Sequence, residues 1–115
     1  MDNLTILRDQ LRSFAAERDW DQFHSPKNLS AALAVEAAEL LEIFQWLTEA
    51  QSRELPAETL ASVKEEVADV LLYLIRISDK LGIDPIAAAQ DKLLLNAKKY
   101  PVAAARGTAT KYDKL

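Results

Sequence analysis

The stretch LAVEAAELLEIFQWL (residues 33–47) carries an apolar helical pattern that two acids, Glu36 and Glu39, interrupt. On a helical wheel at about 100° per residue, Glu36 falls among the leucines and isoleucine that should form the apolar face. The three-residue offset places both carboxylates on one side of the helix, one turn apart. The stretch therefore predicts a helix with acids on its core-facing side.

A second stretch, VKEEVADVLLYLI (residues 63–75), repeats the pattern with Glu66 and Asp69. Glu66 falls among apolar residues on its own helical wheel, and Asp69 lies one turn further along the same side. Other acids of the chain lie more to the side of the helices or near their ends, where solvated charge is usual. The sequence thus singles out two pairs of acids.

We expect the two pairs to meet. The surrounding patterns predict helices near residues 27–50 and 57–81. At about 1.5 Å per residue, Glu39 and Glu66 lie roughly 16 Å and 14 Å from the connecting turn, so an antiparallel hairpin brings them to one level. A buried carboxylate without a partner costs several kcal/mol, and hard divalent cations prefer oxygen ligands. The sequence predicts a metal site here; the alternative is a pair of solvated charged faces.

Composition restricts the class of protein. The chain has 115 residues, with 18 acids against 14 bases, a net charge of -4 and no cysteine. This balance disfavours a nucleic-acid polymer as partner, and the lack of cysteine excludes disulfides and thiolate metal sites. Neither a signal-peptide pattern nor an apolar run long enough to span a membrane is present. We expect a cytoplasmic protein without a membrane partner.

Further helices are expected on both sides of the hairpin. Apolar residues spaced by three and four predict a helix over residues 3–18, with Asn3 as its cap. The helix of the first acid pair should begin at Ser25-Pro26, and Gly82 should close the helix of the second pair. Residues 51–58 read as the turn between these two helices, and Pro56 should open the second of them.

The last helix should begin at Asp84-Pro85 and end before Tyr100-Pro101. With only 2 glycines and 4 prolines, the chain has too little turn chemistry for a fold of many strands. We expect an all-α fold with a four-helix core, in a single domain over residues 1–115 with a basic tail at residues 102–115. Both central helices are apolar on more than one side, which favours a homo-oligomer.

Two further groups of residues could bind a ligand. The aromatic group could form a slot for a flat base, although core packing is the commoner fate of such side chains. It consists of Trp20, Phe23, His24, Trp46 and Tyr73. The polar group suits phosphate oxygens, although a solvated helix end is the common alternative. It consists of Lys92, Asn96, Lys98, Lys99, Arg106 and Lys111.

Taken together, these motifs resemble the MazG-like, all-α nucleoside triphosphate pyrophosphohydrolases, and among them the dCTP pyrophosphatase branch. The family's E-x-x-E and E-x-x-D motifs are matched by the two acid pairs. More specific are WDQFHSPKNL (20–29), FQW (44–46), DVLLYL (69–74), the pattern K-x-x-x-N-x-x-K-Y-P (92–101) and KYDKL (111–115). The resemblance covers nearly the whole chain.

The resemblance implies a site and an activity. It implies that Mg²⁺ is held by Glu36, Glu39, Glu66 and Asp69, which are also the catalytic residues. It implies that the base and sugar are surrounded by Trp20, Asp21, Gln22, Phe23, His24, Trp46 and Tyr73, and that Lys92, Asn96, Lys98, Arg106 and Lys111 contact phosphates. The expected reaction is hydrolysis of a nucleoside triphosphate, dCTP or a modified dCTP by preference, to monophosphate and pyrophosphate. The expected assembly is a homodimer or homotetramer.

One departure from the family and two rival interpretations remain. Close relatives can carry a second histidine on the first helix, where this chain has Leu11. A carboxylate-bridged di-iron bundle is disfavoured, because such sites pair glutamate with histidine on two helices and His24 is the only histidine. A non-catalytic helical oligomer or nucleotide-binding module is the other alternative, and it would bind nucleotide without releasing pyrophosphate.

Overall fold

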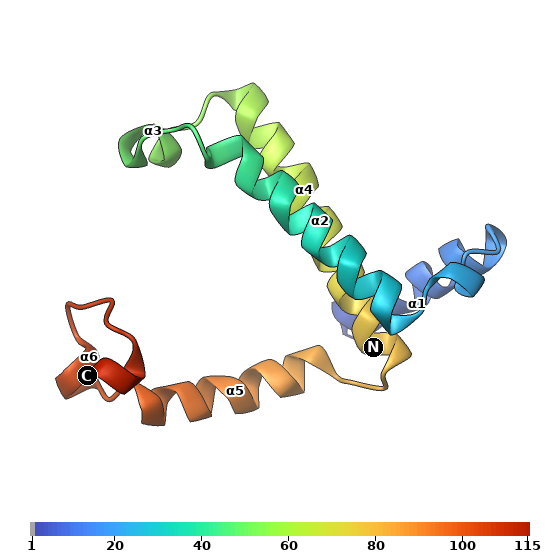
Figure 1. The fold of residues 1–115 in the computed structure, drawn as a ribbon. Coiled ribbons are helices and arrows are strands. Elements are labelled where there is room, and N and C mark those ends of the chain that lie inside the picture. The colour runs from blue at the N-terminus through green and yellow to red at the C-terminus, as the bar shows by residue number, and fades with distance from the viewer. Residues whose placement is uncertain (1) are drawn as a thin grey trace. The chain divides into compact units, whose positions relative to one another are not determined.

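A computed structural model describes residues 2–115, and within that range every regular element is a helix (Figure 1). The four long helices are α1 Asn3–Glu17, α2 Pro26–Phe44, α4 Ala57–Lys80 and α5 Pro85–Lys99. The short elements are α3 Glu49–Arg53, α6 Val102–Ala105 and 3-10 turns at Asp21–Phe23 and Tyr112–Lys114. The prediction of an all-α fold is confirmed, and the four long helices lie where the sequence predicted them.

The chain divides into two compact units, the first ending at Gly82 and the second spanning Ile83–Leu115. In the first unit, α2 and α4 form an antiparallel hairpin and lie side by side, and α1 packs against α4 (Figure 1). The predicted hairpin is therefore present, and it is the part of the fold that positions both acid pairs. The expectation of a single domain stays a prediction.

Caps define several helix boundaries as the sequence predicted. The Ser25 hydroxyl accepts a hydrogen bond from the Asn28 backbone N–H at 3.2 Å, and Pro26 takes the first helical position of α2. Asp84 caps α5 in the same way, accepting from the backbone N–H groups of the next turn. Gly82, just past the end of α4, has a φ of 68°, the left-handed conformation that glycine adopts at low cost.

Two predicted boundaries are wrong, and in both cases a neighbouring side chain makes the better cap. Helix α2 ends at Phe44 instead of continuing to about residue 50, because Thr48 starts the separate helix α3 in a stretch predicted to be partly turn. Thr48 and Gln51 each accept a hydrogen bond from the other's backbone N–H, a reciprocal capping box. At the first helix, Asp2 is the cap instead of Asn3, and its carboxylate accepts from the Thr5 N–H at 2.7 Å.

The first unit has a small interior. Among residues 2–82, the buried apolar residues are Ala15, Leu29 and Ile75, one from each of the three long helices of this unit. Many large apolar side chains on the hairpin are exposed instead: Val35, Leu41, Leu60, Val67, Leu71 and Leu74. An isolated soluble domain seldom exposes so many apolar side chains on one pair of helices.

In the second unit, residues at the end of α5 contact an aromatic residue of the tail. The rings of Tyr100 and Tyr112 meet edge to face at 6.0 Å between centroids, and the Lys99 ammonium lies 4.8 Å from the centre of the Tyr112 ring. The tail contains short helical turns, although its sequence shows no clear period. Across residues 2–115, no helix is long and apolar enough to cross a membrane.

Candidate functional site

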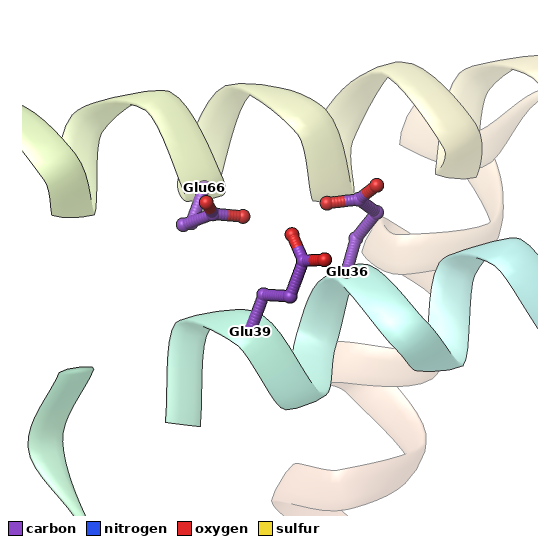
Figure 2. A group of neighbouring side chains, drawn as sticks. All are labelled: Glu36, Glu39 and Glu66. Carbon is purple, nitrogen blue, oxygen red and sulfur yellow. The ribbon is translucent and has the colours of Figure 1, made fainter. Parts of the chain in front are cut away.

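The hairpin brings three carboxylates together. Glu36 and Glu39 come from α2 and Glu66 comes from α4, and one oxygen of each lies within 4.8 Å of one oxygen of each of the others. Figure 2 shows the three side chains pointing toward one another in the space between the two helices. We call Glu36, Glu39 and Glu66 the acid cluster.

Two carboxylate oxygens of the acid cluster are buried and lack a hydrogen-bond partner among residues 2–115. The Oε2 atoms of Glu36 and Glu66 are buried, and no donor among residues 2–115 hydrogen-bonds to either of them. A buried polar atom without a partner is rare in folded proteins, because the lost hydration is not replaced. These two oxygens therefore mark a place where a positively charged group would be stabilised.

The electrostatics of the acid cluster agree with its geometry. Burial is the main cause that raises the pKa of Glu36 to about 7. Contact with the Glu39 carboxyl and the charges of Glu39, Asp69 and Glu66 act in the same direction. Burial and the charge of Glu39 also raise the pKa of Glu66 above its ordinary value. The charge of Glu39 thus destabilises the ionised forms of Glu36 and Glu66. A set of oxygen donors that repel one another and lack a partner fits a hard divalent cation.

Asp69, the fourth predicted acid, lies beside this cluster. It is not one of the three carboxylates that approach within 4.8 Å, but its charge contributes to the raised pKa of Glu36 and of Glu66. Asp69 also lines a neighbouring cavity. It therefore joins the acid cluster to that cavity, and its role as a metal ligand stays a prediction.

The cavity has a volume of about 200 Å³ and lies between α1, α4 and the loop that precedes α2. It is lined by Leu11, Phe14, Ala15, Trp20, His24, Asp69, Leu72, Tyr73 and Arg76. Trp20 meets Phe14 edge to face, with ring centroids 5.6 Å apart, and its ring centroid lies 6.2 Å from that of His24. A small space with aromatic walls and a few polar groups is typical of a site for a flat, partly polar molecule.

Three of the aromatic residues that the sequence singled out line this cavity: Trp20, His24 and Tyr73. The others do not. Phe23 is 58% exposed, and Trp46 is 87% exposed in the turn that follows α2. Their predicted contact with a base stays a prediction.

Asp21 and Gln22, which the resemblance placed near the base, make contacts within the protein. The Asp21 carboxylate accepts hydrogen bonds from Arg76 and from Lys80, and the Lys80 bond lowers its pKa. The Gln22 amide donates to the backbone oxygen and carboxylate of Asp19, a residue in the left-handed conformation at φ 55°. Both side chains hold the loop in shape, and a direct role at the ligand stays a prediction.

The predicted phosphate contacts lie in the second unit. Lys92, Asn96 and Lys98 are on α5, while Arg106 and Lys111 follow α6. Their role toward phosphate stays a prediction. Leu11 lines the cavity, so the position where relatives can carry a histidine faces the same space as His24.

The sequence reasoning missed Arg76. This arginine is 5% exposed, and it contacts His24, Asp21 and Asp79. Its position was accessible from the pattern, because it follows Asp69 by seven residues and Tyr73 by three and so shares their helix face. A buried arginine on the acid side of α4 is the signal that could have identified it.

The chain is similar to proteins of known family. Residues 31–115 match the MazG-like family. The chain is 44% identical over 104 residues to dCTP pyrophosphatase 1 of Mus musculus, an alignment that covers 89% of this chain and 61% of that protein. The corresponding human protein is 42% identical over 105 residues, with the same coverage. The chain thus spans about three-fifths of the length of these curated relatives.

A solved structure is also similar. It is the crystal structure of a pyrophosphatase from Archaeoglobus fulgidus, which matches this chain with a TM-score of 0.78 and 41% sequence identity. The match covers 88% of this chain and 94% of that one.

Proposed function

This chain belongs to the MazG-like family, and from that premise we propose that it hydrolyses a nucleoside triphosphate to the monophosphate and pyrophosphate. The preferred substrate in this proposal is dCTP or a modified dCTP, after the named activity of the relatives. The observation that carries the proposal is the pair of buried, unpartnered oxygens on Glu36 and Glu66. Asp69, whose charge acts on both glutamates, lines a cavity of about 200 Å³ that has aromatic walls.

The acid cluster and Asp69 would hold Mg²⁺, which when bound neutralises charge on the phosphate oxygens and on the transition state. Glu36 and Glu39 lie one turn apart on α2, so either carboxylate can accept a proton from the attacking water. In this proposal all four acids are catalytic residues.

The cavity would orient the other end of the substrate. The ring of Trp20 offers a face on which a base can stack, a contact that contributes on the order of 1–3 kcal/mol. The apolar side chains of Phe14 and Leu72 exclude water from the base. Because Asp69 lines the cavity and acts electrostatically on Glu36 and Glu66, a base held there lies next to the carboxylates.

Pyrophosphate release from a panel of triphosphates, with and without Mg²⁺, tests the proposal. The panel includes dCTP and 5-methyl-dCTP beside the other deoxynucleotides and the ribonucleotides. We expect Mg²⁺-dependent release that is fastest with a cytosine nucleotide. The Glu66→Gln variant should lose activity at least about 100-fold, because it removes a charge from the acid cluster.

Glu65→Gln is the matched control, since Glu65 is the exposed neighbour on the same helix. It should retain the wild-type rate. Binding of nucleotide without any release of pyrophosphate would favour the alternative of a non-catalytic nucleotide-binding module. Equal rates in both variants would contradict a catalytic acid cluster.

We also propose that the protein acts as a homodimer or homotetramer in the cytoplasm, where it would remove nucleotides from the precursor pool. The support for an oligomer is the set of exposed apolar side chains on α2 and α4, which another copy could cover. Light scattering after gel filtration measures the mass. A monomeric mass at micromolar concentration would contradict this part of the proposal.

A further inference from the structure

Arg76 lines the cavity, but its positive charge is paired with carboxylates of the protein. Its side chain lines the cavity and is almost fully buried. Its Nη2 group donates to the Asp21 carboxylate, and its Nη1 group lies 3.9 Å from the carboxylate of Asp79. The third nitrogen, Nε, donates its N–H to Nδ1 of His24 at 3.1 Å.

The hydrogen bond from Arg76 determines which ring nitrogen of His24 carries the proton. An arginine guanidinium is charged at every relevant pH and can only donate. His24 must therefore accept at Nδ1, so Nδ1 carries no proton and the neutral ring carries its proton on Nε2. Burial, and then the charge of Arg76, lowers the pKa of His24, in agreement with a neutral ring.

With Nδ1 bonded to Arg76, the Nε2–H group of His24 is the donor that remains for a ligand. No acceptor for it is present among residues 2–115, although His24 lines the cavity. Water that enters the cavity can accept this hydrogen bond, and a ligand that supplies an acceptor takes the place of that water.

The orientation of Arg76 is itself fixed from three elements. Asp79, on α4, is held by two hydrogen bonds from Arg12 of α1, at 2.7 and 2.5 Å. Asp21, in the loop before α2, is held by Lys80 at 2.9 Å. We call Arg12, Asp21, Arg76, Asp79 and Lys80 the ion-pair network.

We propose that Arg76 is a positioning residue, which holds His24 in the Nε2–H tautomer and so makes the cavity donate a hydrogen bond to an acceptor on the bound base. A carbonyl oxygen or an unprotonated ring nitrogen of the base is such an acceptor, and a pyrimidine offers a carbonyl oxygen beside its sugar. The proposal rests on the proposed function only for the identity of the ligand. The tautomer itself follows from the contacts of this chain alone.

The tautomer can be measured directly. His24 is the only histidine of the chain, so long-range proton–nitrogen correlation spectra of ¹⁵N-labelled protein need no further assignment. At about pH 8, well above the ordinary pKa of histidine, the ring is neutral. We expect a protonated Nε2 and an unprotonated Nδ1, without nucleotide or metal. A ring protonated on Nδ1 would overturn the proposal.

The variant Arg76→Lys separates positioning from simple ion pairing. Lysine keeps a positive charge near Asp21 and Asp79, which protects the fold, but it lacks the Nε–H group. We expect the ring of His24 to become a mixture of both tautomers. Arg12→Lys is the matched control, because Arg12 belongs to the same network and has no contact with His24. It should keep the wild-type spectrum, and an Arg76→Lys spectrum identical to wild type would overturn the proposal.

Binding of dCMP, followed by calorimetry without metal, tests the donor. Glutamine can place an amide N–H near the position of Nε2, whereas the shorter asparagine side chain cannot. We expect His24→Gln to bind dCMP within about threefold of wild type and His24→Asn to bind about tenfold more weakly. Equal dCMP affinity in wild type and His24→Asn would overturn the donor role. Failure of wild type to bind dCMP would count against the proposed function, and the tautomer would still decide the role of Arg76.

Discussion

Helix α4 carries two groups of charges that differ in how they are compensated. Toward its middle, Glu66 faces Glu36 and Glu39, and two carboxylate oxygens are buried without a donor. Nearer its C-terminal end, Arg76 and Asp79 are surrounded by partners of opposite charge from α1 and the loop before α2. The two groups thus share helix α4, but the charges of the ion-pair network have partners of opposite sign and those of the acid cluster do not.

This difference separates two uses of buried charge. In the ion-pair network each charge has its counter-charge within the chain, so the network is complete when the protein folds. In the acid cluster no counter-charge reaches the two buried oxygens from residues 2–115, and in our proposal an external cation supplies it. The cavity touches both groups, through Asp69 at one side and Arg76 at the other. Removing a charge should therefore have opposite consequences in the two groups.

The largest expected effect on stability is the replacement of Arg76 by methionine. This change keeps an apolar stem but removes the donors to the Asp21 carboxylate and to Nδ1 of His24. Asp79 keeps its hydrogen bonds from Arg12 and Asp21 keeps the one from Lys80, so we expect a loss of about 1–3 kcal/mol. Unfolding in urea, at neutral pH and without metal, measures the loss.

Arg12→Met is the control for that measurement. It removes both short hydrogen bonds to Asp79, but the Arg12 side chain is 52% exposed and water can replace part of them. We expect a clearly smaller loss. If both variants lose the same stability, burial is not what makes Arg76 important.

The next effect is the response to Mg²⁺. A cation bound by the folded protein and not by the unfolded chain raises the melting temperature, by about 5 °C or more at saturation. Glu66→Gln should show a much smaller rise, while Glu65→Gln should respond like wild type because Glu65 points to solvent. Equal rises in wild type and Glu66→Gln would mean that the acid cluster binds no metal.

The sequence predicted most of the fold for identifiable reasons. Helix caps depend on interactions within one turn, so consecutive residues are enough to predict them. Such caps set the helix starts at Ser25-Pro26 and Asp84-Pro85 and the helix end at Gly82. The break after Phe44 was missed because leucine and tryptophan continue the apolar pattern past it. What ends the helix is the capping box of Thr48 and Gln51, a polar signal that competes with that pattern.

The site was predictable where it depends on spacing along one hairpin, and not where it depends on contacts between distant segments. The acid cluster follows from two three-residue offsets and the length of two helices, so it was found. The contacts of Arg76 with Asp21 and His24 join residues separated by more than fifty positions. Such pairings depend on how the loop before α2 packs against α4, which no local pattern specifies.

The pH dependence of stability should differ in sign between the two groups. Burial and the nearby carboxylates raise the pKa of Glu36 from 4.5 to about 7, so the folded protein holds this proton more tightly than the unfolded chain. The resulting stability is complete below the unfolded pKa and is lost as the pH rises through about 7. Metal-free protein should therefore become less stable between about pH 5 and pH 8.

The ion-pair network behaves in the opposite way. Hydrogen bonds from Arg12 and from Lys80 lower the pKa values of Asp79 and Asp21, so their contribution is lost only as the pH falls below the ordinary value of 3.8. Urea midpoints measured between about pH 5 and pH 8 lie outside this range, and the His24→Gln background removes the titration of His24, whose lowered pKa acts in the same window with the opposite sign. With saturating Mg²⁺ the decline toward pH 8 should disappear, and a decline that persists would contradict a cation bound by these carboxylates.

The smallest effect is a gain of stability from the loss of a charge. Glu36→Gln keeps the shape of the side chain, removes one of the repelling carboxylates and adds an amide that can donate to Glu39. In metal-free protein at about pH 8, where the Glu36 carboxyl is mostly ionised, the variant should melt on the order of 1–3 °C higher than wild type. Glu42→Gln, an exposed position on the same helix, should leave the melting temperature unchanged. A destabilised Glu36→Gln would show that the carboxylate is already compensated within the chain, and the difference between the acid cluster and the ion-pair network would then be lost.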